Sequence, residues 1–85
     1  MKLSLTYSAF REMEQIPQTP LREITEAILA LAEDPLPATS AVLEDQGGCL
    51  YIPVGEHCIV YHIGEDEHEL TVLGVVDELT LCTVH

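Results

Sequence analysis

The stretch CLYIPVGEHCIVYHIGEDEHELTVLGVV, residues 49–76, decides the fold, because apolar and polar residues alternate through it in three runs. The pair Gly55-Glu56 separates the first two runs, and the polar residues 64–68 separate the second from the third. The runs are rich in Val, Ile, Leu and Tyr, which favour strands that bury at least one face. A Gly-X pair suits a tight type II′ hairpin turn. We therefore predict a three-stranded antiparallel meander.

The residues before this meander predict one more strand and two helices. Residues 2–7 alternate apolar and polar side chains, which is typical of a strand with one buried face. Ser8 is placed to cap a first helix, which Pro17 ends. Thr19 is placed to cap a second helix, and Pro20 suits its first turn because the missing N–H has no partner there.

The second helix is the longest helix that the sequence predicts. Apolar residues recur at spacings of three and four through residues 21–31, which indicates one buried helix face. The prolines that follow Asp34 end this helix, because they remove donors and disfavour helical geometry before them. Residues 39–43 predict an edge strand or an extended lead-in, and the alternation through residues 77–85 leaves a further strand open.

These elements predict one α+β domain spanning residues 1–85, with an N-terminal strand and a two-helix hairpin packed on a small antiparallel sheet. A chain of 85 residues can bury one core and little else. Period 2 in the strands and period 3.6 in the helices select the core residues. They are Leu3, Leu5, Phe10, Met13, Leu21, Ile24, Ile28, Leu31, Ile52, Ile59, Tyr61, Val72 and Val75.

The charge of the chain is strongly negative. Fifteen acidic residues face only Lys2, Arg11 and Arg22, and the formal net charge is −12. Such a surface repels phosphate, so we expect binding of neither nucleic acid nor anionic membranes. No apolar run approaches the ~20 residues of a membrane helix or resembles a signal-peptide core, so we expect a cytoplasmic location. An adaptation to high salt is an alternative origin of the charge.

Two parts of the sequence resemble the RelE/ParE superfamily of toxin-antitoxin toxins. In that family a strand ending in Val-Gly-Asp leads through an aromatic residue and an arginine into a Val-Tyr strand, which residues 50–61 resemble. An acidic loop and the strand-like residues 70–73 follow in the same order. Residues 28–35 are similar to the family's helix end, which stops at Asp-Pro. The resemblance covers residues 1–76 and implies the family's α+β fold.

The resemblance also implies a chemistry to look for. A RelE-type nuclease cuts messenger RNA on the ribosome, which needs a proton acceptor, a proton donor and cations beside the reacting phosphate. The family's cationic positions on the first meander strand correspond to Cys49 and Tyr51, and its arginine corresponds to Cys58. Asp77 and Glu78 follow the last strand, where the family has basic, histidine or tyrosine residues. Each aligned cationic position is neutral or acidic in this chain.

Three functions follow from these observations. The first is a catalytically degenerate family member that binds a protein, such as an antitoxin-like chain. The second is an active toxin, either a ribosome-dependent mRNA endonuclease or a gyrase inhibitor; in an endonuclease, Glu56, His57 and Glu78 are the candidates for proton transfer. The third is a small acidic adaptor that binds a basic protein. None of the three requires a cofactor.

Three residues are candidate ligands of a structural zinc ion. Cys58 and His62 are four residues apart on one predicted strand and hence share a face, and Cys49 could approach Cys58 across the hairpin. Zinc favours this ligand set. The paired spacing of known zinc motifs is absent, however, and cysteine is often buried simply as a small hydrophobic residue. We therefore expect no metal.

Two segments are candidates for partner binding. The acidic residues Glu65, Asp66 and Glu67 could attract a basic partner, although a solvated hairpin loop explains them as well. Leu79 and Leu81 belong to the uncharged residues 79–84, which could pair through a sheet edge with a partner or a second copy. The alternative for residues 79–84 is a strand that closes the sheet within one chain.

Overall fold

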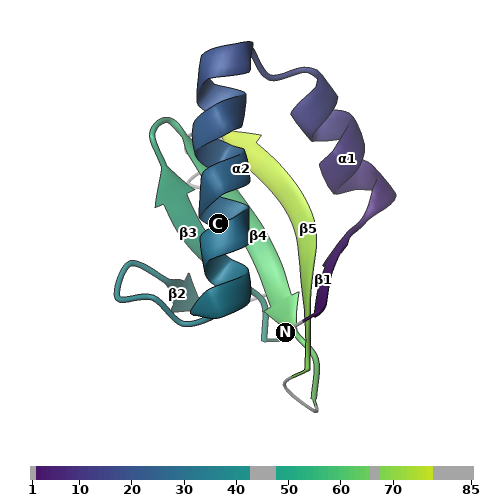
Figure 1. Ribbon diagram of the computed structural model, residues 1–85, viewed down its shortest axis with the longest axis vertical. Coiled ribbons are helices and arrows are strands. Elements are labelled where there is room, and N and C mark those ends of the chain that lie inside the picture. The colour runs from purple at the N-terminus through teal and green to yellow at the C-terminus, as the bar shows by residue number, and fades with distance from the viewer. Residues whose placement is uncertain (1, 43–47, 66–67, 78–85) are drawn as a thin grey trace.

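The computed structural model describes residues 2–42, 48–65 and 68–77, which form a five-stranded sheet with two helices on one face (Figure 1). The sheet order is β1-β5-β4-β3-β2, so the first strand lies beside the last described one. The architecture is α+β, as predicted. Its elements are β1 (Lys2–Leu5), α1 (Tyr7–Glu14), α2 (Gln18–Glu33), β2 (Ala41–Val42), β3 (Leu50–Val54), β4 (His57–Ile63) and β5 (Glu69–Asp77).

The predicted meander is confirmed in β3, β4 and β5. These strands pair antiparallel, with Ile52 opposite Ile59 and Ile59 opposite Val75. The tight turn between β3 and β4 needs a positive φ, and Gly55 has a φ of 62°. Val60 opposes Gly74 while Tyr61 opposes Val72, so β5 carries a bulge at the intervening residue.

The sheet is mostly antiparallel, as predicted, but at one edge β1 pairs parallel with β5. Lys2 lies opposite Glu69, and Leu5 lies opposite Val72. Parallel neighbours need a long crossover connection, and the chain between β1 and β5 supplies one. At the other edge, β2 has only two residues, so it is shorter than the predicted segment 39–43, whose last residue lies outside the described ranges.

Both helices begin at residues other than those predicted. Thr6, not Ser8, caps α1: its Oγ1 accepts the Ala9 N–H at 3.1 Å and donates to the Leu73 carbonyl at 2.9 Å. The hydroxyl therefore joins α1 to β5, a contact that local sequence does not reveal. The second helix starts at Gln18 directly after Pro17, whose extended backbone takes the cap position without a side-chain hydrogen bond.

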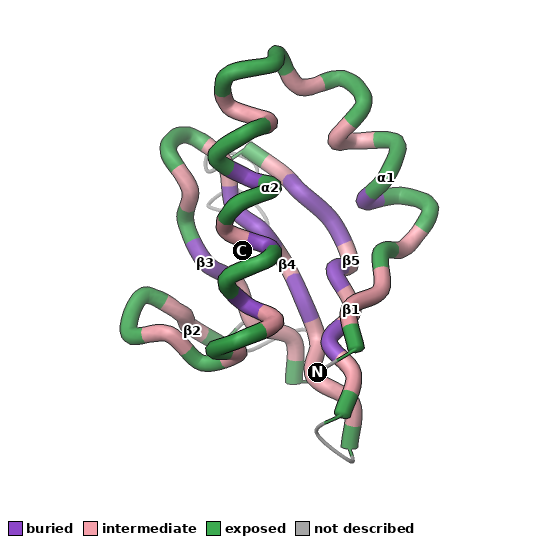
Figure 2. The backbone as a smooth tube through the Cα atoms, in the orientation of Figure 1, coloured by how far each residue is buried: buried purple, intermediate pink, exposed green. Residues whose placement is uncertain are grey.

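The core lies between the helices and the sheet, as Figure 2 shows by the buried positions of α2, β4 and β5. Eight predicted core residues are buried: Ile24, Ile28, Leu31, Ile52, Ile59, Tyr61, Val72 and Val75. Leu3 and Met13 are half-buried against this cluster, and Leu21 is half-buried as well. The buried set also includes Ala9 and Leu70, which are not among the predicted core residues.

The prediction was wrong for Leu5 and Phe10, which are 43% and 53% exposed. Ala9 is fully buried instead, and Met13 follows it at the i+4 position of the same helix face. Ile16, which lies beyond the end of α1, also packs against the core. The small side chain of Ala9 suits the face of α1 that lies against β5. The buried face of α1 therefore contains Ala9 in place of Phe10, while Met13 lies on it as predicted.

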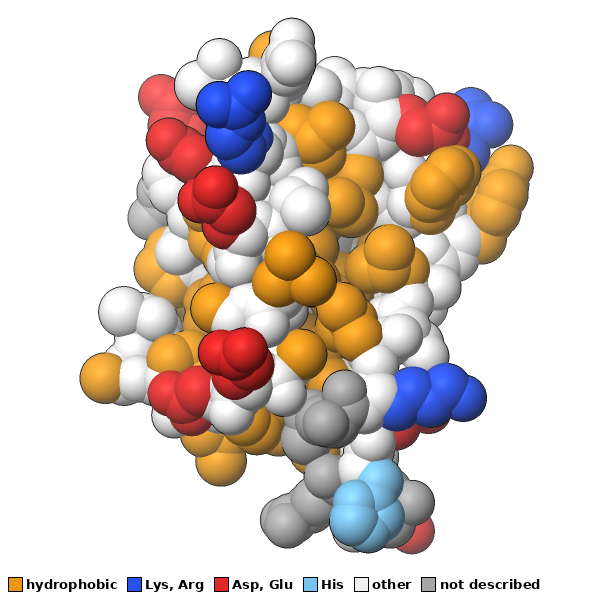
Figure 3. All heavy atoms as spheres, viewed as in Figure 1, with side chains coloured by type: hydrophobic (Ala, Val, Ile, Leu, Met, Phe, Trp, Pro, Cys, Tyr) orange, Lys and Arg blue, Asp and Glu red, His pale blue; other side chains and the backbone are white. Residues whose placement is uncertain are grey.

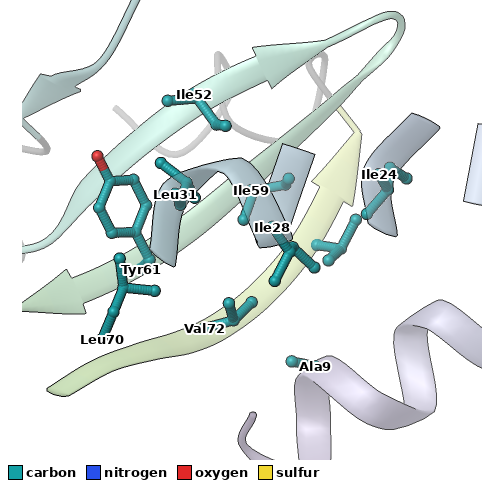
Figure 4. Close-up of a cluster of buried hydrophobic side chains, with 10 residues drawn as sticks. Ala9, Ile24, Ile28, Leu31, Ile52, Ile59, Tyr61, Leu70 and Val72 are labelled. Carbon is teal, nitrogen blue, oxygen red and sulfur yellow. The ribbon is translucent and has the colours of Figure 1, made fainter. Parts of the chain in front are cut away.

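Tyr61 connects the sheet to the segment that follows α2. Its ring is buried in the core (Figure 4), and its hydroxyl donates to the Pro35 carbonyl at 2.7 Å. Burial raises the pKa of Tyr61 above its usual value. Within the described residues, no helix is long and apolar enough to cross a membrane.

Candidate functional site

The sheet has two faces with different surroundings. Both helices lie over the face that carries Ile52, Ile59 and Val72 (Figure 1). Because successive strand residues point to opposite faces, the residues between these core positions belong to the other face. We call it the outer face; its described residues are Tyr51, Pro53, Cys58, Val60, His62, Thr71 and Val76.

The outer face holds two of the residues that align with the family's cationic positions. Tyr51 lies opposite Val60, and Cys58 lies opposite both Pro53 and Val76. Cys58 is 1% exposed, so a solvent-facing thiol is not available at this position. The centre of the outer face is therefore built from uncharged side chains.

The remaining aligned positions lie at the ends of strands. Cys49 immediately precedes β3 and is half-buried. Asp77 is the last residue of β5 and is exposed. Glu78 lies outside the described residues.

The three basic residues of the chain are far apart in the fold. Lys2 is on the edge strand β1, where its Nζ lies 3.8 Å from a carboxylate oxygen of Glu69. Arg11 is on α1, with its guanidinium carbon 6.0 Å from the centre of the Tyr7 ring. Arg22 is exposed on α2. Figure 3, which views the helix side, shows the basic side chains separated from one another at the margins of that face.

The candidates for proton transfer do not form one group among the described residues. Glu56 is exposed in the turn between β3 and β4. His57 opens β4 and lies opposite Asp77, where both line a pocket on the helix side. The third candidate, Glu78, lies outside the described residues. Among the described residues, neither the outer face nor these candidates place a proton donor or acceptor beside a lysine or arginine.

The pocket beside His57 has a volume of about 390 Å³ and lies between the α1–α2 turn and the ends of β4 and β5. Within it, Oε1 of Glu12 accepts the Val75 N–H at 3.0 Å. A Cβ at Gly74 would lie 3.0 Å from this oxygen, so glycine leaves room for the carboxylate. The lining residues are Glu12, Gln15, Ile16, Pro17, His57, Val75, Val76 and Asp77.

Sequence reasoning missed this pocket, because the helical period assigns Glu12 to the solvent side of α1. One signal was present: a glycine inside a strand pattern often marks a bulge or a close approach of another group. Gly74 serves in this way here.

The hairpin of β3 and β4 does not bring the three candidate zinc ligands together. Cys58 lies opposite Pro53, four residues along β3 from Cys49. Cys58 and His62 do share the outer face, but four residues of extended strand separate their Cα atoms by about 13 Å. In the part of the chain that the structure describes, no three His, Cys, Asp or Glu residues form a group that could hold a metal ion.

The two predicted partner-binding segments are described only in part. Glu65 is exposed in the loop between β4 and β5, whereas Asp66 and Glu67 lie outside the described residues. Leu79 and Leu81 also lie outside them. Pairing through residues 79–84 therefore stays a prediction.

Comparison with known proteins gives matches in solved structures. No protein-family model and no curated protein sequence matches the chain. A chain of the toxin-antitoxin complex RelBE2 from Mycobacterium tuberculosis superposes with a TM-score of 0.79 at 20% identity, over 91% of this chain and 96% of that one. The YoeB/ParE toxin from Agrobacterium tumefaciens gives 0.77 at 22% identity, over 92% and 99%.

This chain has the RelE/ParE-like fold. A third match agrees: a chain of the archaeal RelE-RelB complex from Pyrococcus horikoshii OT3 has a TM-score of 0.77 at 15% identity, over 89% of this chain and 92% of that one. The RelE/ParE-like fold that the sequence resemblance implied is thus confirmed. Sequence identities this low show the fold and not the activity.

Proposed function

We propose that this chain is a catalytically degenerate protein of RelE/ParE-like fold that acts by binding another protein. The main support for this proposal is the outer face of the sheet. There, Tyr51 and Cys58 occupy positions that are cationic in the nucleases of the RelE/ParE superfamily. RNA cleavage builds negative charge on a phosphate, and positioned cations are the usual means of stabilising it. The uncharged centre of this face lacks them.

The distribution of charge supports the same proposal. A carboxylate brought toward a phosphate without a neighbouring cation adds repulsion and raises the barrier. Glu56 and Asp77 are acidic and stand at the turn and strand end beside His57. The whole chain carries a net charge of −12, which also opposes the counterion release that drives binding to nucleic acid.

A protein partner accords with both the comparisons and the charge. Two of the three matching chains described above come from toxin-antitoxin complexes. By analogy, the partner is an antitoxin-like chain, and the net charge of −12 favours one with a basic binding surface. Electrostatic complementarity of this kind accelerates association and suppresses wrong partners.

The decisive experiment uses purified protein and ribosomes programmed with a defined message, with a RelE toxin assayed in parallel as the positive control. We expect the RelE toxin to cut the message in the A site and this chain to leave it intact. Cleavage by this chain that disappears in the His57→Ala variant would overturn the proposal, because it would show a catalytic site without the family's cations.

If a short reading frame beside the gene encodes a DNA-binding protein, partner binding is tested separately by co-expressing that product with the tagged chain. We expect the two products to co-purify at physiological salt and to separate as salt is raised, because charge attraction is screened. If the products do not co-purify at low salt, the antitoxin-like partner is excluded.

A further inference from the structure

The pocket between the α1–α2 turn and the strand ends combines apolar walls with carboxylates. Ile16, Pro17 and Val75 supply apolar surface, while Glu12 and Asp77 supply the carboxylates. Its volume of about 390 Å³ is at the small end of the range for ligand pockets, which suits one long side chain better than a cofactor.

The Glu12 carboxylate is held in position before any ligand arrives. Its Oε1 accepts the Val75 N–H at 3.0 Å, and the absence of a Cβ at Gly74 lets it approach β5. An ionised carboxylate has about four acceptor sites, so this bond leaves further acceptor capacity on the same group. A fixed acceptor lowers the entropy lost on binding.

No lysine or arginine of the chain balances the charge in this pocket. Lys2, Arg11 and Arg22 are all outside the lining. The titratable side chains that do line it are Glu12, His57 and Asp77. An apolar wall that ends in carboxylates complements a side chain with an aliphatic stem and a cationic head. Arginine fits best, because its planar guanidinium can donate two hydrogen bonds to one carboxylate.

We propose that this pocket binds an arginine side chain of the protein partner, with the aliphatic stem against Ile16 and Val75 and the guanidinium between Glu12 and Asp77. This inference rests on the proposed function, since it names the chemical group by which the partner is recognised. It makes the pocket a specific contact, in addition to the general attraction that an acidic chain exerts on a basic one.

The test is an NMR titration of the full ¹⁵N-labelled chain with N-acetyl-arginine-N-methylamide. Its matched control probe is the citrulline analogue, which has nearly the same shape and no charge. We expect saturable shifts of the Ile16, Val75 and Asp77 amides with the arginine probe and none with the citrulline probe. Equal responses to both probes, or no response at these amides, would overturn the proposal.

Variants separate the pocket from the overall negative charge. Glu12→Gln keeps an oxygen acceptor for the Val75 N–H and removes the charge. Asp77→Asn removes the charge of the other carboxylate, at an exposed position. Each should weaken binding of the arginine probe about fivefold. Glu26→Gln, on the exposed side of α2, removes the same charge outside the pocket and should leave binding unchanged. Equal weakening by Glu26→Gln would show non-specific attraction and sink the proposal.

A third variant perturbs the pocket without changing its charge. Gly74→Ala places a methyl group 3.0 Å from Oε1 of Glu12 and should displace the carboxylate, weakening probe binding by a similar factor. Dispersed spectra establish that each variant is folded. The titration involves no ribosome and no partner chain, so message cleavage would overturn the proposed function alone, and an unresponsive pocket would overturn this inference alone.

Discussion

Tyr61 shows how one hydroxyl can hold two parts of the fold together. The ring is fully buried under α2, and the hydroxyl donates to the Pro35 carbonyl just beyond the end of that helix. The side chain thus connects the middle of β4 to the segment leading into β2. Desolvation by burial is the main cause of its raised pKa, and the nearby Asp34 carboxylate adds to it, while a hydrogen bond with Ser40 acts in the opposite direction.

We predict that Tyr61→Phe lowers the free energy of unfolding by about 1–2 kcal/mol, because the Pro35 carbonyl loses its donor. The native state also retains the Tyr61 proton above the unfolded pKa of about 10, so wild-type stability should fall as pH rises past that value. Urea unfolding from pH 8 to 11 should show a smaller decline for Tyr61→Phe than for wild type.

The matched control is Tyr51→Phe on the outer face, which should change stability by less than about 0.5 kcal/mol. A Tyr61→Phe protein as stable as wild type, with the same decline at high pH, would contradict the assignment of this hydrogen bond.

At the scale of elements, α1 is attached to β5 by polar contacts as well as by its apolar face. Thr6 donates to the Leu73 carbonyl, and Glu12 accepts from the Val75 N–H. Both contacts are made by the part of β5 that extends beyond its pairing with β1. There, Thr6 and Glu12 supply the hydrogen-bond partners that a neighbouring strand would otherwise provide.

Glu12→Ala removes the acceptor of the Val75 N–H. We expect hydrogen exchange at the Val75 amide to accelerate at least tenfold, because the amide loses its partner at a residue of β5 that β1 does not reach. Glu14→Ala, a change to an exposed residue of the same helix, serves as the control and should leave that rate unchanged. Equal exchange rates in wild type and Glu12→Ala would mean that this carboxylate does not protect the amide in solution.

The same elements show what sequence patterns can and cannot predict. The meander follows from alternation and turn residues close together in the chain, and β3 and β4 have the predicted bounds. The cap at Thr6 and the bond of Glu12 depend on residues more than 60 positions away, which no local pattern contains. The pocket arises from those distant contacts, so the sequence indicated a functional role only for His57 and Asp77 among its residues, and that role was a different one.

At the scale of the molecule, the net charge of −12 opposes compaction through self-repulsion. Salt shortens the range of this repulsion from about 14 Å at 0.05 M to about 4 Å at 0.5 M. We therefore predict that NaCl over this range raises the thermal midpoint by roughly 5 °C. Calorimetry or circular dichroism measures this midpoint directly.

Charge-reversal variants provide the comparison for this salt effect. Glu26→Lys and Glu33→Lys change exposed positions of α2, and the second also places a cation in the last helical turn, which has no basic residue. The double variant should be more stable at low salt and respond less to NaCl. A midpoint that falls with added salt would show that self-repulsion does not limit stability.

The parallel pairing of β1 with β5 also determines when the fold can be completed during synthesis. Lys2 cannot pair until Glu69 has been synthesised. Ribosomes add residues at about 5–20 per second, so roughly 3–13 s separate the synthesis of these two residues. During that interval both edges of β1 are open, and the helices that follow it have no completed sheet to cover. Until β5 leaves the ribosome, such a nascent chain stays soluble only if aggregation is slow or if a chaperone protects it.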